Sequence, residues 1–197
     1  MSHNVSWEKY IKKTESNPPR VLLTEAVEHV RNKDEALDLG AGAMNDSKYL
    51  LSVGFKHVTA IDSDIAAQEK AKDILGDKFS FFLSSFENFS FPHETYDLIN
   101  AQYALPYNSP KTFNSLIKNI TLSLKPKGVF AGQLFGNKDS WNTENSGKTF
   151  HTKEEAEKLF LDFKIIKFIE EENDKPSVLG KPKHQHLFNF IVSKPEK

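Results

Sequence analysis

The sequence predicts an α/β protein in which helices cover both faces of an open, mostly parallel sheet. Short apolar runs alternate with helical patterns over residues 35–136, which is typical of parallel strands joined by crossover helices. Two longer strand-like runs follow, at residues 163–173 and 186–194, and the connection between them contains Pro and Gly. We therefore expect these last two runs to form an antiparallel pair at one edge of the sheet.

Local signals predict each element in order. Apolar residues recur at helical spacing in several segments, and Gly54 and Gly76 are placed to end two of the helices. Asp64 or Ser63 is expected to cap the helix that follows the second strand. The expected helices are residues 7–13, 20–32, 46–55, 64–76, 111–124 and 152–160, and the expected strands are residues 36–40, 57–62, 79–83, 96–102, 128–136, 163–173 and 186–194.

Length and composition predict one cytoplasmic domain over residues 1–197. A chain of 197 residues is long enough for a single sizeable core, and 38% hydrophobic with 27% charged residues is ordinary for a globular protein. No run approaches the roughly 18 apolar residues that a membrane span needs, and the start of the chain lacks the apolar core of a secretory signal. We expect no association with a membrane.

Charge balance and the lack of cysteine exclude several classes of function. Lys plus Arg (26) nearly cancels Asp plus Glu (27), so the net charge of −1 gives no global field to attract nucleic acid. Without cysteine the chain has no disulfide, no thiolate zinc site and no cysteine nucleophile. We expect neither a nucleic-acid partner nor a metal.

The stretch EALDLGAGAMND, residues 35–46, is the most informative part of the sequence. It holds the first strand-to-helix turn, where Gly40 and Gly42 allow close approach of the backbone to a ligand. A dinucleotide loop would place a third glycine where this chain has Asn45, and Asp38 at the strand end would repel a pyrophosphate. A NAD-dependent oxidoreductase is therefore a disfavoured alternative.

S-adenosylmethionine suits this turn better, because it carries a sulfonium and an ammonium and has no phosphate. Asp62 ends the second strand. Its separation from Gly40 along the sequence is close to that usual for a carboxylate that accepts hydrogen bonds from both ribose hydroxyls. Taken singly, Asp38 is also explained as a surface charge, and Asp62 as a helix cap. Their order within the alternating pattern favours cofactor binding.

At these residues the sequence resembles the class I S-adenosylmethionine-dependent methyltransferases, from about residue 7 to residue 194. ALDLGAG is similar to their first motif, VTAIDSD to the acidic end of their second strand, and YDLINAQYALPY to their fourth strand. The segment LSLKPKGVFAGQLFG is similar to the one leading through their fifth strand. The resemblance is greatest to small bacterial enzymes of the tellurite-resistance and uncharacterised small-molecule type, which also carry W-x-x-Y, PPR and KHxH segments.

The resemblance implies a Rossmann-like sheet of seven strands, with an antiparallel last strand near residues 187–193, and S-adenosylmethionine as the cofactor. It implies that residues 1–33 contribute to a lid over cofactor and acceptor. Arg20 is expected either to meet the cofactor carboxylate or to be an ordinary solvated arginine. The residues carried over to the cofactor site are Arg20, Asp38, Gly40, Ala41, Gly42, Asp62, Ser63, Ser85, Phe86 and Asn100, together with Ala101 beside Asn100.

Two positions depart from the family pattern. Met44 occupies the third glycine position of the first motif, where we expect it to crowd the methionine end of the cofactor. Ser84 and Ser85 stand where many members have an aspartate that contacts adenine. A non-catalytic methyltransferase-like binding protein is therefore kept as an alternative to an enzyme.

The expected reaction is methyl transfer to a small-molecule acceptor of unknown identity. Such a transfer needs alignment and exclusion of water, with a base only where the acceptor arrives protonated, so no catalytic residue is predicted. Three kinds of acceptor are excluded. Cytosine C5 methylation would need a cysteine, and amino methylation of bases usually goes with a [DN]-P-P-[YF] segment where this chain has NAQY. Catechol-type methylation would need acidic residues after the fourth strand, and this segment has none.

Aromatic residues and histidines outside the sheet pattern are the candidates for the acceptor pocket. An aromatic pocket suits a small, partly apolar or cationic acceptor. At their spacing, Trp7 and Tyr10 are more often a packing face of a helix than part of a pocket, and the two histidines more often lie on the surface of one strand than act in catalysis. The candidates are Trp7, Tyr10, Tyr103, Tyr107, Trp141, His184 and His186.

Overall fold

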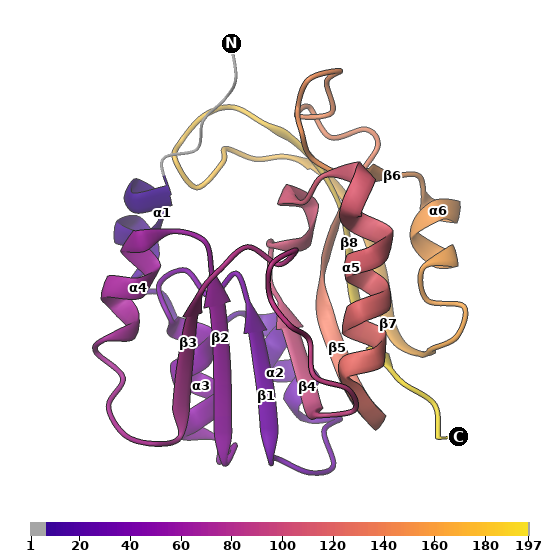
Figure 1. The fold of residues 1–197 in the computed structure, drawn as a ribbon. Helices are drawn as coiled ribbons and strands as arrows, with labels where there is room; N and C mark the ends of the chain where they lie inside the picture. Colours follow the sequence, from indigo (N-terminus) through magenta and orange to yellow (C-terminus); the bar gives the residue numbers. More distant parts are fainter. Residues whose placement is uncertain (1–6, 197) are drawn as a thin grey trace.

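The computed structural model describes residues 7–196 and shows an eight-stranded sheet with helices on both faces (Figure 1). The helices are α1 (Trp7–Thr14), α2 (Val21–Val27), α3 (Asn45–Ser52), α4 (Ile65–Ala71), α5 (Pro110–Ser123) and α6 (Lys153–Lys158), with the 3-10 helix η1 (Leu105–Tyr107). The strands are β1 (Glu35–Leu39), β2 (His57–Asp62), β3 (Phe79–Leu83), β4 (Tyr96–Ala101), β5 (Leu124–Gly136), β6 (Phe150–His151), β7 (Lys164–Asp174) and β8 (His184–Ser193).

The strand order confirms the predicted fold class. Seven strands follow the path β3-β2-β1-β4-β5-β8-β7, in which β1 to β5 are parallel and β8 is antiparallel to both β5 and β7. The order reverses between β1 and β4, so the carboxyl ends of these strands flank the crevice where open α/β sheets bind ligands. The eighth strand, β6, pairs with β5 over two residues and is too short to leave a periodic signal in the sequence.

Alternating side chains on the strands build two hydrophobic layers. In β1, Leu37 and Leu39 pack with residues of α5 and α6, whereas Ala36 packs with residues of α2 and α3. Each fully buried Leu or Phe contributes about 1.5–3 kcal/mol, so these layers hold the strand ends in place beneath the site. The first layer includes Phe113, Leu116, Ile120, Phe130, Phe160 and Phe190.

Several helices are shorter than predicted. The helix expected to run to Gly76 ends at Ala71, because Leu75 beyond it is 90% exposed and has nothing to pack against. Its start is as expected, since the Asp64 side chain accepts a hydrogen bond from the amide of Ala66. The helix expected over residues 20–32 ends at Val27. Within residues 7–196, no helix has both the length and the apolar character required to span a bilayer.

Candidate functional site

A cavity of about 780 Å³ lies at the carboxyl ends of the parallel strands. Helix α1 forms one wall, and the connection between β7 and β8 arches across the strand ends towards it (Figure 1). The strand ends contribute Gly40, Ala41, Gly42, Ala43, Asp62, Ser63, Ser84, Ser85, Phe86, Gln102, Tyr103 and Ala104 to the lining. The walls above them contribute Trp7, Tyr10, Ile11, Thr14, Arg20, Tyr107, Trp141 and residues 175–179.

The two glycines after β1 serve different purposes. Gly40 has φ +73°, and a Cβ placed on it would lie 2.5 Å from the Cβ of Ala104, so this glycine lets the turn pack against the segment after β4. Gly42 has φ +51°, and a Cβ there would meet no atom closer than 3.9 Å. Gly42 is therefore the glycine that exposes its backbone to the cavity, whereas Gly40 is required for packing.

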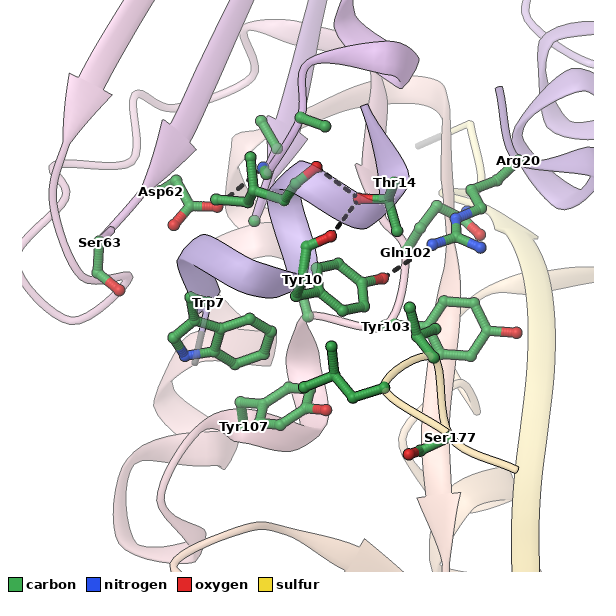
Figure 2. A pocket seen from close by; sticks show the side chains of 18 of the residues that line it. Trp7, Tyr10, Thr14, Arg20, Asp62, Ser63, Gln102, Tyr103, Tyr107 and Ser177 are labelled. Atoms are coloured by element: carbon green, nitrogen blue, oxygen red, sulfur yellow. Dashed lines mark hydrogen bonds between the residues drawn. The ribbon is translucent and has the colours of Figure 1, made fainter. Parts of the chain in front are cut away.

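Asp62 stands at the tip of β2 with its carboxylate held by the backbone. Its Oδ2 accepts a hydrogen bond of 2.9 Å from the amide of Gly42 (Figure 2), and its Oδ1 accepts one of 2.9 Å from the amide of Asp64. Burial raises the pKa of Asp62, and these backbone bonds oppose the rise. Each carboxylate oxygen can accept two hydrogen bonds and receives one from these amides, so each can accept a further bond, which suits a ligand with two neighbouring hydroxyls.

Asp38 lies beneath the cavity rather than in its wall. Its side chain is 2% exposed and accepts hydrogen bonds from Ser47 Oγ at 2.6 Å and from Asn100 Nδ2 at 2.9 Å. Neither Asp38 nor Asn100 lines the cavity, although both were expected among the cofactor residues. Burial, reinforced by the charge of Asp46, raises the pKa of Asp38 to about 7.

Asp46 lines the cavity and was missed by sequence reasoning, which treated it only as the start of a helix. Its Oδ1 accepts a hydrogen bond from the amide of Arg20 at 2.9 Å, and its Oδ2 accepts one from Asn100 Nδ2 at 3.2 Å. Burial raises its pKa above the ordinary value. Asp38, Asp46, Ser47 and Asn100 therefore form an acidic layer whose negative potential favours a cationic group in the adjoining part of the cavity.

Met44 points away from the cavity. Its backbone is left-handed, with φ 65°, the conformation that a glycine at this position would adopt without strain. Its side chain is fully buried and packs in the cluster of Ile11, Ala60 and Ala67. The expectation that Met44 crowds the methionine end therefore differs from the structure, because the side chain leaves the turn on the side of α1 and α4.

Arg20 is tied into the cavity wall. Its guanidinium donates a hydrogen bond of 2.9 Å to Tyr10 Oη and lies 5.1 Å from the ring centroid of Tyr103 (Figure 2). Thr14 Oγ1 donates a hydrogen bond of 2.9 Å to the carbonyl of Tyr10, and this bond stabilises the last turn of α1, which carries Tyr10. Arg20 is therefore not an ordinary solvated arginine. Of the lid expected over residues 1–33, residues 1–6 lie outside the described part of the chain.

Edge-to-face rings continue the wall beyond α1. The ring centroids of Trp7 and Tyr107 are 4.8 Å apart, those of Tyr107 and Phe135 are 5.8 Å apart, and those of Phe135 and Trp141 are 6.0 Å apart. Figure 2 shows Trp7, Tyr10 and Tyr107 gathered on one side of the cavity. The predicted aromatic candidates are thus brought together in one place.

The two histidines expected near the acceptor stand outside the cavity lining. His184 lies at the surface, with Nδ1 2.8 Å from Asp174 and Nε2 3.2 Å from Glu172. His186 is 1% exposed, so its expected surface position is wrong: its Nε2 lies 3.0 Å from Glu170, and its Nδ1 accepts a bond from the amide of Lys138. These carboxylates hold both rings on the β7 side.

Residues of the β7–β8 connection were not predicted to reach the cavity. Lys175, Ser177, Lys181 and Lys183 line it because the hairpin arches over the strand ends. In the sequence this segment is marked by its Pro and Gly content and, at residues 183–186, by the KHxH pattern. Over residues 7–196, no three His, Asp or Glu side chains are grouped so as to hold a metal ion.

Comparison with known proteins agrees with this geometry. Residues 36–128 match the family model described as a methyltransferase domain. A curated relative, N-terminal Xaa-Pro-Lys N-methyltransferase 1 of Xenopus tropicalis, is 32% identical over 98 residues, which cover 48% of this chain. The match spans 44% of the length of that relative.

Solved structures share the fold over nearly the whole chain. TehB from Haemophilus influenzae has a TM-score of 0.73 at 20% identity, covering 95% of this chain and 67% of TehB. The N-methyltransferase NodS from Bradyrhizobium japonicum, in complex with S-adenosylhomocysteine, has a TM-score of 0.68 at 16% identity, covering 98% of this chain and all of NodS (100%).

Proposed function

Because this chain carries a class I S-adenosylmethionine-dependent methyltransferase domain, we propose that it transfers the methyl group of S-adenosylmethionine to a small-molecule acceptor. The observation that carries the proposal is the Asp62 carboxylate, which is held by the amides of Gly42 and Asp64 at the cavity and keeps acceptor positions for a ribose diol. This arrangement recognises a nucleoside without offering a site for phosphate.

The charges of the cavity suit the two ends of this cosubstrate. Ser63, Ser85 and Phe86 line the cavity beside Asp62, where the adenosine would lie. Burial disfavours the charged forms of Asp38 and Asp46, and a nearby ammonium or sulfonium would restore them, so this layer favours the cationic groups of the cosubstrate. Arg20 is placed to meet the carboxylate. The cavity volume of about 780 Å³ lies in the upper part of the range found for ligand sites, which leaves space for an acceptor beside the cosubstrate.

The reaction is a displacement at the methyl carbon. A lone pair of the acceptor forms the new bond to this carbon, the carbon–sulfur bond breaks, and its electron pair stays on sulfur to give S-adenosylhomocysteine. Any proton on the attacking atom leaves to solvent. The chain contributes alignment and exclusion of water, through α1 on one side and the β7–β8 connection on the other.

Two alternatives remain distinguishable from this proposal. A binding protein without activity would hold the cosubstrate and release no S-adenosylhomocysteine with any acceptor. An oxidoreductase would bind NAD, which the acidic layer next to the turn disfavours. A screen of small-molecule acceptors, scored by release of S-adenosylhomocysteine, separates the enzyme from the binding protein.

Calorimetry with S-adenosylhomocysteine tests the first step. We expect binding with a dissociation constant in the micromolar range or below. Absence of both heat and thermal shift at millimolar ligand would contradict the proposal, and so would a clear preference for NAD. The apo protein serves as the reference for the thermal shift, because ligands that bind only the folded state raise its melting temperature.

A further inference from the structure

A buried side-chain amide supports one wall of the cavity from behind. Gln133 lies near the end of β5, is 2% exposed and is not part of the cavity lining. Its Oε1 accepts a hydrogen bond of 2.7 Å from the amide of Tyr103, and its Nε2 donates one of 2.8 Å to Gln102 Oε1. Gln102 and Tyr103 both line the cavity. Because an amide is costly to bury unless it is hydrogen-bonded, these two bonds fix Gln133 against the wall.

Hydrogen bonds on both sides of Gln133 set the direction of its amide. Gln102 Nε2 donates a bond of 2.8 Å to Asn100 Oδ1, and Asn100 Nδ2 donates one of 2.9 Å to Asp38. A backbone N–H can only donate and a carboxylate accepts, so the two ends of this chain of amides require the same direction. The oxygen of the Gln133 amide is therefore held towards Tyr103.

Tyr103 has a backbone conformation that needs support. Its φ of 57° is left-handed, a region that a residue with a side chain keeps only where its surroundings hold it there. The parallel pairing of β4 with β5 ends at Ala101 and Gly132, so the chain has left β5 when it reaches Tyr103. Its amide bonds to the Gln133 side chain in place of a neighbouring strand. This bond therefore holds the turn that carries the Tyr103 ring.

The Tyr103 ring is one of two groups that flank the Arg20 guanidinium. The guanidinium lies 5.1 Å from the ring centroid of Tyr103 and donates a hydrogen bond of 2.9 Å to Tyr10 Oη (Figure 2). Because a long arginine side chain has many rotamers, these two contacts decide where its donors lie. A guanidinium has five N–H groups, and within residues 7–196 the bond to Tyr10 is the one that its side chain makes. Arg20 therefore keeps donors for a ligand.

We propose that Gln133 is a positioning residue for the carboxylate end of the cosubstrate. It holds the Tyr103 turn, the Tyr103 ring flanks Arg20, and the Arg20 guanidinium meets the carboxylate. This inference rests on the proposed function. Gln133 lies outside the cavity lining, and the adenosine would lie against Asp62 on another strand end, so the effect of Gln133 is confined to ligands that carry the carboxylate.

Two ligands separate this effect from general damage to the site. They are S-adenosylhomocysteine and S-adenosyl-3-thiopropylamine, which is the same molecule without its carboxylate. We call the ratio of their affinities the carboxylate preference, and calorimetry measures both affinities. In the wild type we expect a carboxylate preference of at least about tenfold, because the smaller ligand lacks a charge-assisted bond to Arg20. A thermal melt of each variant reports whether it is folded.

Substitutions at Gln133 and a matched control locate the effect. Gln133→Met keeps the length of the side chain and removes both bonds, so it should reduce the carboxylate preference to within about threefold and leave S-adenosyl-3-thiopropylamine binding within about twofold. Gln133→Glu keeps an oxygen for the Tyr103 amide and should restore the preference. Asn189→Leu is the control, because Asn189 lies opposite Gln133 in the β5–β8 register and its amide nitrogen bonds no described residue; the preference should stay as in the wild type.

Two further variants test whether Gln133 acts through Tyr103 and Arg20. Arg20→Met should abolish the carboxylate preference, and adding Gln133→Met should lower it no further, because residues that act through one another are not additive. Tyr103→Leu removes the ring and leaves the backbone bond to Gln133, so it should also reduce the preference. If Gln133→Met does not fold, Tyr103→Leu decides the outcome.

Several results would overturn the inference. They are no carboxylate preference in the wild type, an unchanged preference in Gln133→Met or Tyr103→Leu, equal weakening of both ligands, a Gln133→Glu protein that behaves like Gln133→Met, a further loss in the double variant, or the same loss in Asn189→Leu. Each leaves the proposed function standing as long as the wild type binds S-adenosylhomocysteine. Absent binding of S-adenosylhomocysteine refutes the proposed function itself.

Discussion

Replacing Asp62 by alanine tests the proposed ribose contact most directly. Asp62→Ala removes two charge-assisted hydrogen bonds to the ribose, each worth about 1.5–3 kcal/mol. The amides of Gly42 and Asp64 lose their acceptor in this variant and are then free to bond a ribose oxygen, which offsets one of the two bonds. A net loss of one bond weakens S-adenosylhomocysteine binding by roughly tenfold to a hundredfold.

The assay is calorimetry with S-adenosylhomocysteine, accompanied by a thermal melt of each variant. Asp64→Ala is the matched control: it removes a carboxylate two residues away that caps α4 and does not line the cavity. The control should lose about 1 kcal/mol of stability as its helix cap is removed, with affinity unchanged. A folded Asp62→Ala protein that binds within about threefold of the wild type would refute the reasoning.

Three further predictions follow from the strand ends. Asp38 has a folded pKa of about 7, above its ordinary value, so the folded state keeps a proton that the unfolded chain loses. Stability should fall as pH rises from about 4 to 7, and Asp38→Asn should flatten this slope in urea titrations compared across pH. Gly40→Ala should destabilise the protein more than Gly42→Ala, because a Cβ at position 40 would lie 2.5 Å from the Cβ of Ala104. Adding Ala104→Gly should recover part of that loss, since it removes the clash. Equal melting temperatures of the two alanine variants would contradict the packing role of Gly40. Met44→Ala should cost about 2–5 kcal/mol of stability in urea unfolding with S-adenosylhomocysteine affinity unchanged, whereas a large gain in affinity for Met44→Gly would show that the turn has decayed.

The fold could be predicted because its signals are local. Apolar runs, glycines after strands and the Asp64 cap each act within a few residues, and they placed β1 to β5 within a few residues of their observed bounds. Helix lengths were less accurate, because the end of α4 depends on whether Leu75 finds a surface to pack against, and no local pattern reveals that.

Cavity residues were predicted after strands and among the aromatic residues, but those brought in by contacts between distant segments were missed. Asp62 and Gly42 come at strand ends and were anticipated, whereas Asp46 was missed because its entry into the cavity depends on the amide of Arg20 from another segment. Lys183 reaches the rings of Trp141 and Phe135 because the β7–β8 connection arches over the strand ends. Local sequence patterns locate the end of a strand. Tertiary packing decides which distant loop covers that strand end.

The rings of Tyr107, Phe135 and Trp141 have a consequence for how this molecule could be modified. These rings and the lysines beside them all follow residue 106 in the chain, whereas the residues proposed to hold the cosubstrate all precede residue 105. On the proposed function, the first half of the chain holds the donor, whereas the acceptor meets rings from both halves, since Trp7 and Tyr10 also line the cavity. Exchange of the later segments between proteins of this fold would then alter what is methylated while conserving the source of the methyl group.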